Sequence, residues 1–225
     1  MIYILDTADL NAIKHANEFY PIEGVTTNPS LIAKEKCDFK QRLLDIRKII
    51  GPDKLFCVQT TSKLADDIVK EARALKALVG GNFCIKIPIG EEGLKATMAL
   101  KKEGIGVLMT AIFSASQALV AAKAGASMVA PYVNRLEMIN GNGVEAVAEM
   151  VELFDHFGLD CKVLAASFKN VQQVCDCALA GCHYATVSLD VLSACIKHPM
   201  TDLAVEGFDK DWQGVYGDKK VIDLI

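Results

Sequence analysis

The sequence predicts an α/β fold, a single (β/α)8 barrel of the TIM type with an extra helix at its C-terminal end. The chain has 225 residues, 52% of them hydrophobic, which is close to the usual size of one such barrel. Short β-rich runs alternate with longer amphipathic runs, and the short runs are apolar on both faces, as in parallel strands covered by helices. No low-complexity linker divides the sequence. We therefore expect one domain over residues 1–225.

The first half of the chain contains four predicted strands with helices between them. The strands are the β-rich runs over residues 2–5, 24–27, 54–59 and 83–88. Apolar side chains at helical spacing predict helices over residues 9–18, 39–50 and 64–78. A further helix opens at Pro29, because proline suits the first turn of a helix.

The second half repeats this arrangement. Its predicted strands cover residues 106–112, 128–133, 162–167 and 183–187, and its helices cover residues 93–103, 114–124, 144–157, 170–179 and 189–196. A last amphipathic helix, about residues 202–213, lies outside the eight units and carries the apolar side chains of Leu203, Val205, Phe208 and Trp212. This stripe would suit packing on the chain's own barrel.

Eight strand–helix units form either an open doubly wound sheet or a closed barrel. A dinucleotide-binding sheet would carry G-x-G-x-x-G after the first strand, but that stretch reads Asp6-Thr7-Ala8-Asp9. The closed barrel is favoured, and we expect no cofactor.

The charge pattern excludes several partners. The net charge is -4 and the basic residues are dispersed, so nothing indicates nucleic acid or an anionic membrane surface. No apolar run reaches the roughly 18 residues of a membrane span, and the N-terminus does not resemble a signal peptide. We expect a cytoplasmic protein.

The eight cysteines are expected to be reduced, because most lie in apolar segments of a chain without an export signal. Cys175, Cys177, Cys182 and His183 were the candidate zinc ligands. A C-x-C spacing in a helix points two thiols about 200° apart, which suits one tetrahedral ion poorly. No histidine ends a predicted strand, which argues against a metal-dependent aldolase or a histidine-based hydrolase. We expect no metal.

Polar side chains end nearly every predicted strand, where the active sites of such barrels lie. They are Asp6, Thr26, Thr27, Asn28, Gln59, Lys86, Thr110, Tyr132, Arg135, Ser167 and Lys169. For Gln59 and Thr110 alone, ordinary hydrogen bonding at a strand end would be an adequate explanation. The whole set predicts a functional site.

Lys86 differs from the others because it lies inside its strand. The two-residue period of a strand puts it on one face with Cys84 and Pro88, opposite Phe83 and Ile85, so it should point into the barrel. Burial disfavours the ammonium form of a lysine and yields the neutral amine that attacks carbonyl groups. The alternative is a buried ion pair with Asp6 that only ties two strands together.

Amine chemistry also needs a proton-transfer group, and Asp6 is the candidate carboxylate at the barrel mouth. Its alternative role is the N-cap of the first helix, which Thr7 or Asp9 could fill instead. On the far side of the mouth, Arg135, Ser167 and Lys169 would form a phosphate-binding cradle at helix N-termini. The alternative for Arg135 is a surface ion pair with Glu137.

These residues resemble the small transaldolase family in order over nearly the whole chain. The matching stretches are Gly24-Val-Thr-Thr-Asn-Pro-Ser30, Lys86-Ile-Pro88, Thr110-Ala-Ile-Phe-Ser114 with Gln117 and Ala118, Ala130-Pro-Tyr-Val-Asn-Arg135, and Ala165-Ala-Ser-Phe-Lys169. Within this family the chain is most similar to the fructose-6-phosphate aldolase branch.

The resemblance implies a class I aldolase, a carbon–carbon lyase of carbohydrate metabolism that reversibly cleaves fructose 6-phosphate to dihydroxyacetone and glyceraldehyde 3-phosphate. Lys86 would form the Schiff base. Asp6, Thr26 and Asn28 would contact the ketone's hydroxyl groups, Gln59, Thr110 and Tyr132 would hold the catalytic water, and Arg135, Ser167 and Lys169 would bind phosphate. A homopentamer or homodecamer is also implied, with the C-terminal helix on a neighbour.

Two other activities remain open at this stage. One is a transaldolase, a transferase of the pentose phosphate pathway that uses the same lysine; the other is a barrel that binds sugar phosphates without turnover. Transaldolases of the family carry Glu where Gln59 stands and usually Phe where Tyr132 stands, so both positions match the aldolase branch. Phe113, where the aldolases carry Tyr, and the tail over residues 218–225 depart from that branch.

Overall fold

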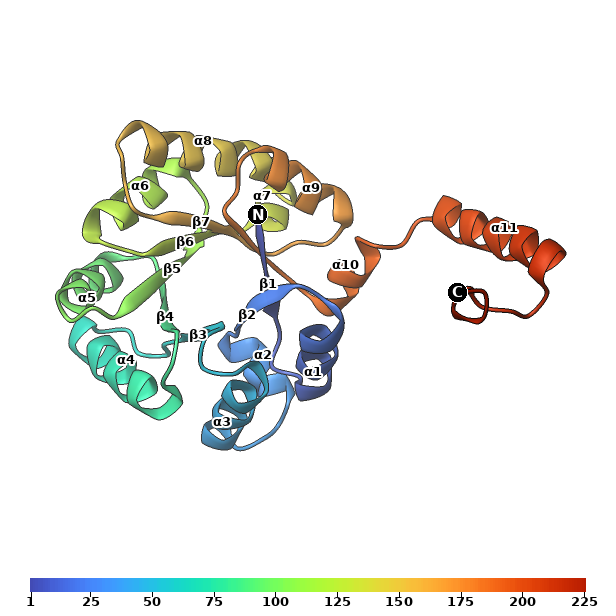
Figure 1. The fold of residues 1–225 in the computed structure, drawn as a ribbon. Coiled ribbons are helices and arrows are strands. Elements are labelled where there is room, and N and C mark those ends of the chain that lie inside the picture. Colours follow the sequence, from blue (N-terminus) through green and yellow to red (C-terminus); the bar gives the residue numbers. More distant parts are fainter.

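The computed structural model describes residues 1–225 and forms a closed barrel of eight parallel strands, each paired with its neighbours in chain order (Figure 1). The strands are β1 (Ile2–Asp6), β2 (Ile22–Thr26), β3 (Leu55–Gln59), β4 (Phe83–Pro88), β5 (Gly106–Ile112), β6 (Met128–Pro131), β7 (Lys162–Ala165) and β8 (Tyr184–Val187). Pairing of β1 with β8 closes the ring. The predicted (β/α)8 barrel is confirmed.

Helices surround the strands on the outside of the barrel (Figure 1). They are α1 (Leu10–Phe19), α2 (Pro29–Lys34), α3 (Phe39–Ile50), α4 (Ala65–Val79), α5 (Glu91–Lys102), α6 (Ala115–Ala124), α7 (Val133–Glu137), α8 (Gly143–His156), α9 (Val171–Leu179), α10 (Leu189–Ala194) and α11 (Pro199–Tyr216), with a final turn η1 (Val221–Asp223). No helix is long and apolar enough to cross a bilayer.

Two differences from the predicted elements concern the mouth of the barrel. The sixth strand ends at Pro131, before a five-residue helix α7 that the sequence pattern did not predict. The seventh strand ends at Ala165, and Ser167 has a φ of 66°, which ends the regular extended backbone. Both strands are short because their last predicted residues turn outward to form the mouth.

The core has two layers, which follow from the alternation of side chains along each strand. Forty-four buried residues, among them Val25, Phe56 and Ile85, fill the space between strands and helices. A smaller set of eight fills the barrel interior: Ile4, Cys57, Cys84, Leu108, Met128, Ala130, Leu164 and Ala166. The interior is therefore packed below the mouth rather than open as a channel.

Strands β2 and β3 approach so closely at residue 24 that only glycine fits there. A Cβ on Gly24 of β2 would lie 2.3 Å from the carbonyl oxygen of Leu55 in β3, so any larger residue would push the two strands apart. This contact holds the end of β2, and with it Thr26 and Asn28, against β3.

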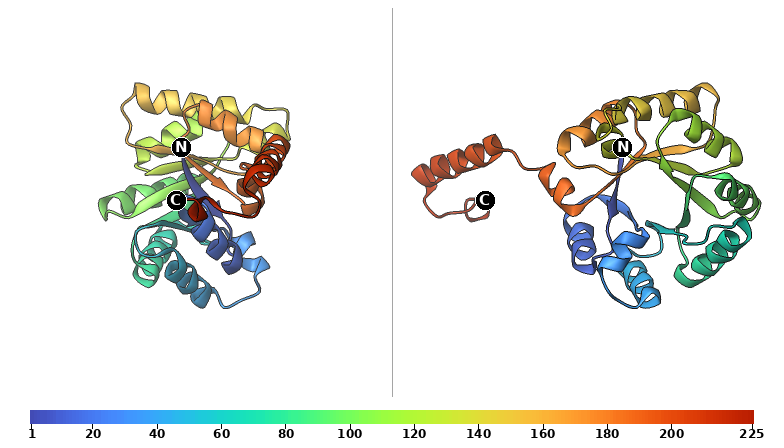
Figure 2. Two further views of the ribbon diagram at one scale, coloured as in Figure 1. Left: turned by 45° about the vertical axis from the view of Figure 1, so that its right-hand side comes forward. Right: turned by 180° about the vertical axis from the view of Figure 1, so that it is seen from behind.

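The C-terminal helix α11 stands apart from the barrel in Figure 1 and in the right-hand view of Figure 2. A short connection after α10 leads outward to it, and none of its residues is buried. The predicted C-terminal helix is present, but it does not pack on its own barrel.

Candidate functional site

A cavity of about 330 Å³ opens at the carboxyl ends of the strands. It is lined by Asp6, Asn28, Leu31, Lys34, Lys86, Tyr132, Arg135, Ala166, Ser167, Phe168, Lys169, Thr186, Ser188 and Asp190. Seven of the ten predicted site residues are in this lining. The other three, Thr26, Gln59 and Thr110, lie beside lining residues, as described below.

Lys86 points from β4 into the barrel, as the strand period predicts. Its outward neighbours Ile85 and Ile87 belong to the layer between strands and helices, whereas Cys84 belongs to the interior layer. Lys86 is only 3% exposed. No buried side-chain nitrogen or oxygen lacks a partner, and Lys86 makes no hydrogen bond or salt bridge to another side chain, so its amine must open onto the cavity.

The structure does not contain the alternative ion pair between Lys86 and Asp6. The three salt bridges are Arg42–Glu35, Lys70–Asp67 and Arg73–Glu103, and none of them includes Lys86 or Asp6. The charge of Lys86 acts on the Asp6 carboxyl, but the two side chains do not form a salt bridge.

Asp6 is held by a chain of hydroxyl groups rather than by a helix terminus. The Thr26 hydroxyl donates to Asp6 Oδ1 at 2.7 Å, and the Thr26 hydroxyl oxygen lies 2.6 Å from the Thr186 hydroxyl oxygen. Asp9, not Asp6, caps α1. Burial raises the pKa of the Asp6 carboxyl, and the charge of Lys86 and the Thr26 hydrogen bond only partly offset this effect. A carboxyl with a raised pKa holds its proton more tightly, which suits it to accept and return protons.

Tyr132 is fixed from three sides at the start of α7. Its hydroxyl lies 3.0 Å from the Thr110 hydroxyl, and the Phe113 ring meets it edge-on at 5.6 Å between centroids. The Arg135 guanidinium lies over the ring face at 4.9 Å. Thr110 precedes Ala111, whose φ of 57° accompanies the register shift in β5. The hydroxyl pair is thus oriented by a local distortion of the strand.

The cationic side of the mouth differs in part from the prediction. Arg135 lies in the last turn of the short helix α7, not at a helix N-terminus, and its guanidinium stacks on Tyr132 instead of pairing with Glu137. Ser167 and Lys169 lie in the connection that precedes the α9 N-cap, Asn170. The backbone N–H of Asn134 donates to the Ser167 carbonyl at 3.1 Å, so the two segments that carry these groups are joined.

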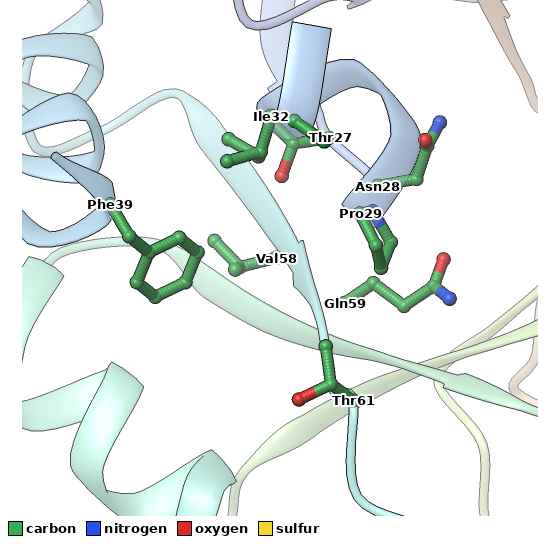
Figure 3. Close-up of a pocket in the computed structure, with 9 residues that line it drawn as sticks. Thr27, Asn28, Pro29, Ile32, Phe39, Val58, Gln59 and Thr61 are labelled. Carbon is green, nitrogen blue, oxygen red and sulfur yellow. The ribbon is translucent and has the colours of Figure 1, made fainter. Parts of the chain in front are cut away.

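Gln59 and Asn28 face the barrel axis beside Lys86. Gln59 is the register partner of Lys86 on the adjacent strand. Figure 3 shows the amide ends of Asn28 and Gln59 on the same side, away from Phe39 and Val58. All four residues also line a second pocket, of about 200 Å³. Asn28 Oδ1 accepts the Leu31 N–H and caps α2, which leaves its amide nitrogen free for a ligand.

Glu71 of α4 orders the loop that follows Gln59. Its carboxylate accepts hydrogen bonds from the hydroxyl of Thr60, from the N–H of Thr61 at 3.0 Å and from the hydroxyl of Ser62 at 2.7 Å. Burial alone would raise the pKa of Glu71, but these donors outweigh burial and hold it below its ordinary value. The loop is therefore anchored by an ionised carboxylate.

Sequence reasoning missed four polar groups of the mouth. Thr186 and Ser188 end β8, and the rule used for the other strands would have identified them had it been applied there. Lys34 and Asp190 lie on helices α2 and α10 and have no strand-end signal. Lys34, Arg135 and Lys169 against Asp6 and Asp190 give the lining an excess of positive charge even without Lys86, which suits an anionic ligand.

The cysteine and histidine cluster considered for zinc does not form a site. All eight cysteines are free thiols, and no three His, Cys, Asp or Glu side chains gather as metal ligands. The Cys182 thiol instead donates to the Tyr184 carbonyl at 3.0 Å, and burial raises its pKa to about 11. His183 Nδ1 accepts the Val163 N–H at 3.2 Å.

Fold and cavity together define a (β/α)8 barrel whose polar and charged groups meet at the carboxyl ends of the strands, the position of active sites in this class. The chain belongs to the transaldolase/fructose-6-phosphate aldolase family, whose model matches residues 3–219. It is therefore a member of a family of transferases and aldolases that share this barrel.

Relatives in that family are similar over almost their whole length. A probable transaldolase of Lachnoclostridium phytofermentans is 43% identical over 97% of this chain and 100% of its own. One of Alkaliphilus metalliredigens is 44% identical over 96% and 99%. Among solved structures, a chain described as native KDPGal has a TM-score of 0.57 at 17% identity, covering 83% of this chain and 81% of its own, which supports the fold alone.

The raised pKa of Asp6 predicts a pH-dependent effect of Asp6→Asn. A carboxyl whose pKa rises above its ordinary 3.8 on folding binds its proton more tightly in the folded chain, so its contribution to the free energy of unfolding falls as pH rises through the raised pKa. Asp6→Asn removes this titration. Its stability relative to the unsubstituted chain, from urea unfolding, should therefore be greater above the raised pKa than near pH 3.8.

Asp190→Asn is the matched control, because the Ser188 hydrogen bond lowers the pKa of Asp190. Its relative stability should change with pH in the opposite direction. Equal pH dependence of the two variants would contradict the assignment for Asp6.

Proposed function

We propose that the protein makes and breaks a carbon–carbon bond in a ketose phosphate through a Schiff base on Lys86. The observation that carries this proposal is the buried Lys86 amine, which faces the mouth cavity with no ion-pair partner. A buried lysine that no carboxylate pairs with directly is a strong candidate for an amine nucleophile.

In the proposed reaction the neutral amine of Lys86 attacks the substrate's ketone carbon, and the resulting carbinolamine loses water to give the imine. Cleavage of the bond between the third and fourth carbons then releases the aldehyde fragment, glyceraldehyde 3-phosphate. The electron pair of that bond remains on the imine as an enamine. Asp6, with its raised pKa, would take and return protons in these steps.

Of the remaining groups at the mouth, some would hold the catalytic water and others would bind the substrate's phosphate. Gln59, Thr110 and Tyr132 would hold the water that hydrolyses the imine. Arg135, Ser167 and Lys169 would bind the phosphate, helped by the positive lining. Asn28 would donate to a substrate hydroxyl through its free amide nitrogen. Thr26 would act through Asp6, since its hydroxyl bonds Asp6 and Thr186.

The fate of the enamine distinguishes two candidate activities. An aldolase protonates it and releases dihydroxyacetone, which needs a proton donor and a held water; the hydrogen-bonded Tyr132 and Thr110 hydroxyls beside the neutral amide of Gln59 favour release. A transaldolase retains the enamine for an acceptor aldose. The relatives, described as probable transaldolases, favour transfer and support it more directly than they support release.

Borohydride trapping tests the proposed Schiff base. Sodium borohydride with dihydroxyacetone or fructose 6-phosphate should leave a stable adduct on the Lys86 peptide, read by mass spectrometry, because reduction of the imine is irreversible. Lys86→Arg should abolish the adduct, whereas Lys34→Arg, which changes another lysine of the lining, should keep it. Absence of any adduct in the unsubstituted chain would show that the barrel only binds sugar phosphates.

An acceptor assay separates release from transfer. Fructose 6-phosphate should be turned over repeatedly without an acceptor if the protein is an aldolase, with dihydroxyacetone as product. Turnover that begins only when erythrose 4-phosphate is added would instead assign a transaldolase. In the first case Tyr132→Phe should lower dihydroxyacetone release about tenfold or more, within the range for loss of a proton-transfer group, and affect borohydride trapping less.

We also propose that α11 packs on a neighbouring copy of the chain, because its apolar side chains have no partner in its own barrel. Leu203, Phe208 and Val215 are 59%, 70% and 74% exposed. Phe208→Glu should shift the mass measured by light scattering towards smaller species, and Lys210→Glu on the same helix should not. A monomeric unsubstituted chain would contradict this packing.

A further inference from the structure

Gln173 of α9 is a nearly buried amide whose polar atoms are all engaged. It is 5% exposed. Its Oε1 accepts the backbone N–H of Lys169 at 2.8 Å, and its Nε2 donates to Asn134 Oδ1 at 3.1 Å and to Glu137 Oε2 at 2.5 Å. One side chain thus joins the connection after β7 to the short helix α7.

These two segments carry the cationic groups of the mouth. Arg135 lies between Asn134 and Glu137 in α7, and Ser167 and Lys169 lie in the connection that Gln173 holds. Ser167 has a φ of 66°, a left-handed conformation that a non-glycine residue keeps only when its surroundings enforce it. The Ser167 carbonyl accepts the Asn134 N–H at 3.1 Å, and Gln173 bonds both Asn134 and Lys169.

Helix α6 begins with the same kind of glutamine-to-backbone hydrogen bond, but its glutamine makes no bond to another helix. Gln117 stands three residues after the N-cap Ser114, as Gln173 does after Asn170, and its Oε1 accepts the Phe113 N–H at 2.8 Å. Its amide nitrogen, however, has no partner on another helix, and Gln117 is not buried. The acceptor role is therefore a local feature of a helix start, whereas the donor role to α7 is particular to Gln173.

We propose that Gln173 is a positioning residue that sets the placement of Arg135 relative to Ser167 and Lys169, and thereby the affinity of the mouth for the phosphate end of the substrate. This inference rests on the proposed function. The amide acts at a distance from the reacting carbon, because it contacts neither Lys86 nor Asp6. Its loss should weaken phosphate binding and leave Schiff-base formation intact.

The conservative variant Gln173→Glu tests this role. It keeps an acceptor for the Lys169 N–H but removes the donor and places a second carboxylate against Glu137. We expect the KM for fructose 6-phosphate to rise about tenfold or more, as for loss of hydrogen bonds to a charged group. Borohydride trapping of dihydroxyacetone, which carries no phosphate, should be unchanged.

A compensating double variant distinguishes loss of the hydrogen bond from loss of folding. The double variant Gln173→Glu with Glu137→Gln restores one amide and one carboxylate with the donor reversed, and should recover most of the KM. Gln117→Leu is the matched control and should leave the KM unchanged. An unchanged KM in Gln173→Glu, or a parallel loss of dihydroxyacetone trapping, would overturn the proposal.

Calorimetric binding of inorganic phosphate separates this inference from the proposed function. If the unsubstituted chain binds phosphate and Gln173→Glu binds it about tenfold more weakly, the positioning role stands even where no Lys86 adduct forms. If both bind phosphate equally, the positioning role fails, while trapping on Lys86 still decides the chemistry.

Discussion

The strict alternation of side chains in eight parallel strands that close on themselves determines the direction of the strand-borne groups at the mouth. In β4 this alternation sends Ile85 and Ile87 to the helices and Lys86 to the interior. Pairing of β3 with β4 then places Gln59 beside Lys86. A slip of one residue in either strand would exchange the two faces and expose apolar side chains to the cavity. The hydrophobic layer outside the barrel therefore fixes the polar arrangement inside it.

The packed interior below the mouth gives Lys86 an apolar floor. Cys57 and Cys84 are register partners in the layer beneath Gln59 and Lys86, and burial raises the pKa of the Cys84 thiol well above its ordinary value. A thiol that stays protonated serves as a small apolar side chain, so Cys84 adds no negative charge beneath Lys86. The interior layer therefore supplies no ion-pair partner to Lys86, and the carboxylate on which Lys86 acts, that of Asp6, lies at the mouth.

Much of this could be predicted from sequence because it depends on local periodicity. Strands β4 and β5 and helix α3 have the predicted bounds, and the inward direction of Lys86 follows from counting by two. Helix α7 was missed because five residues are too few to show a helical period. The left-handed Ser167 and the bridge from Gln173 to Glu137 were missed because they depend on contacts across 36 residues of sequence that no local pattern encodes.

The two sides of the mouth therefore differ in the hydrogen bonds that hold their functional groups in place. Asp6, Gln59, Lys86 and Thr110 belong to strands held by ladder hydrogen bonds. Arg135 lies in the short helix α7, and Ser167 and Lys169 lie in the connection after β7; side-chain hydrogen bonds of Gln173 join these two segments. Tyr132 spans the boundary, because its hydroxyl pairs with Thr110 and its ring carries the Arg135 guanidinium. A phosphate that drew Arg135 towards itself would act directly on the ring that orients this hydroxyl. In the proposed reaction, binding at the anionic end of the substrate and handling of water at Lys86 would then be mechanically coupled through one aromatic side chain.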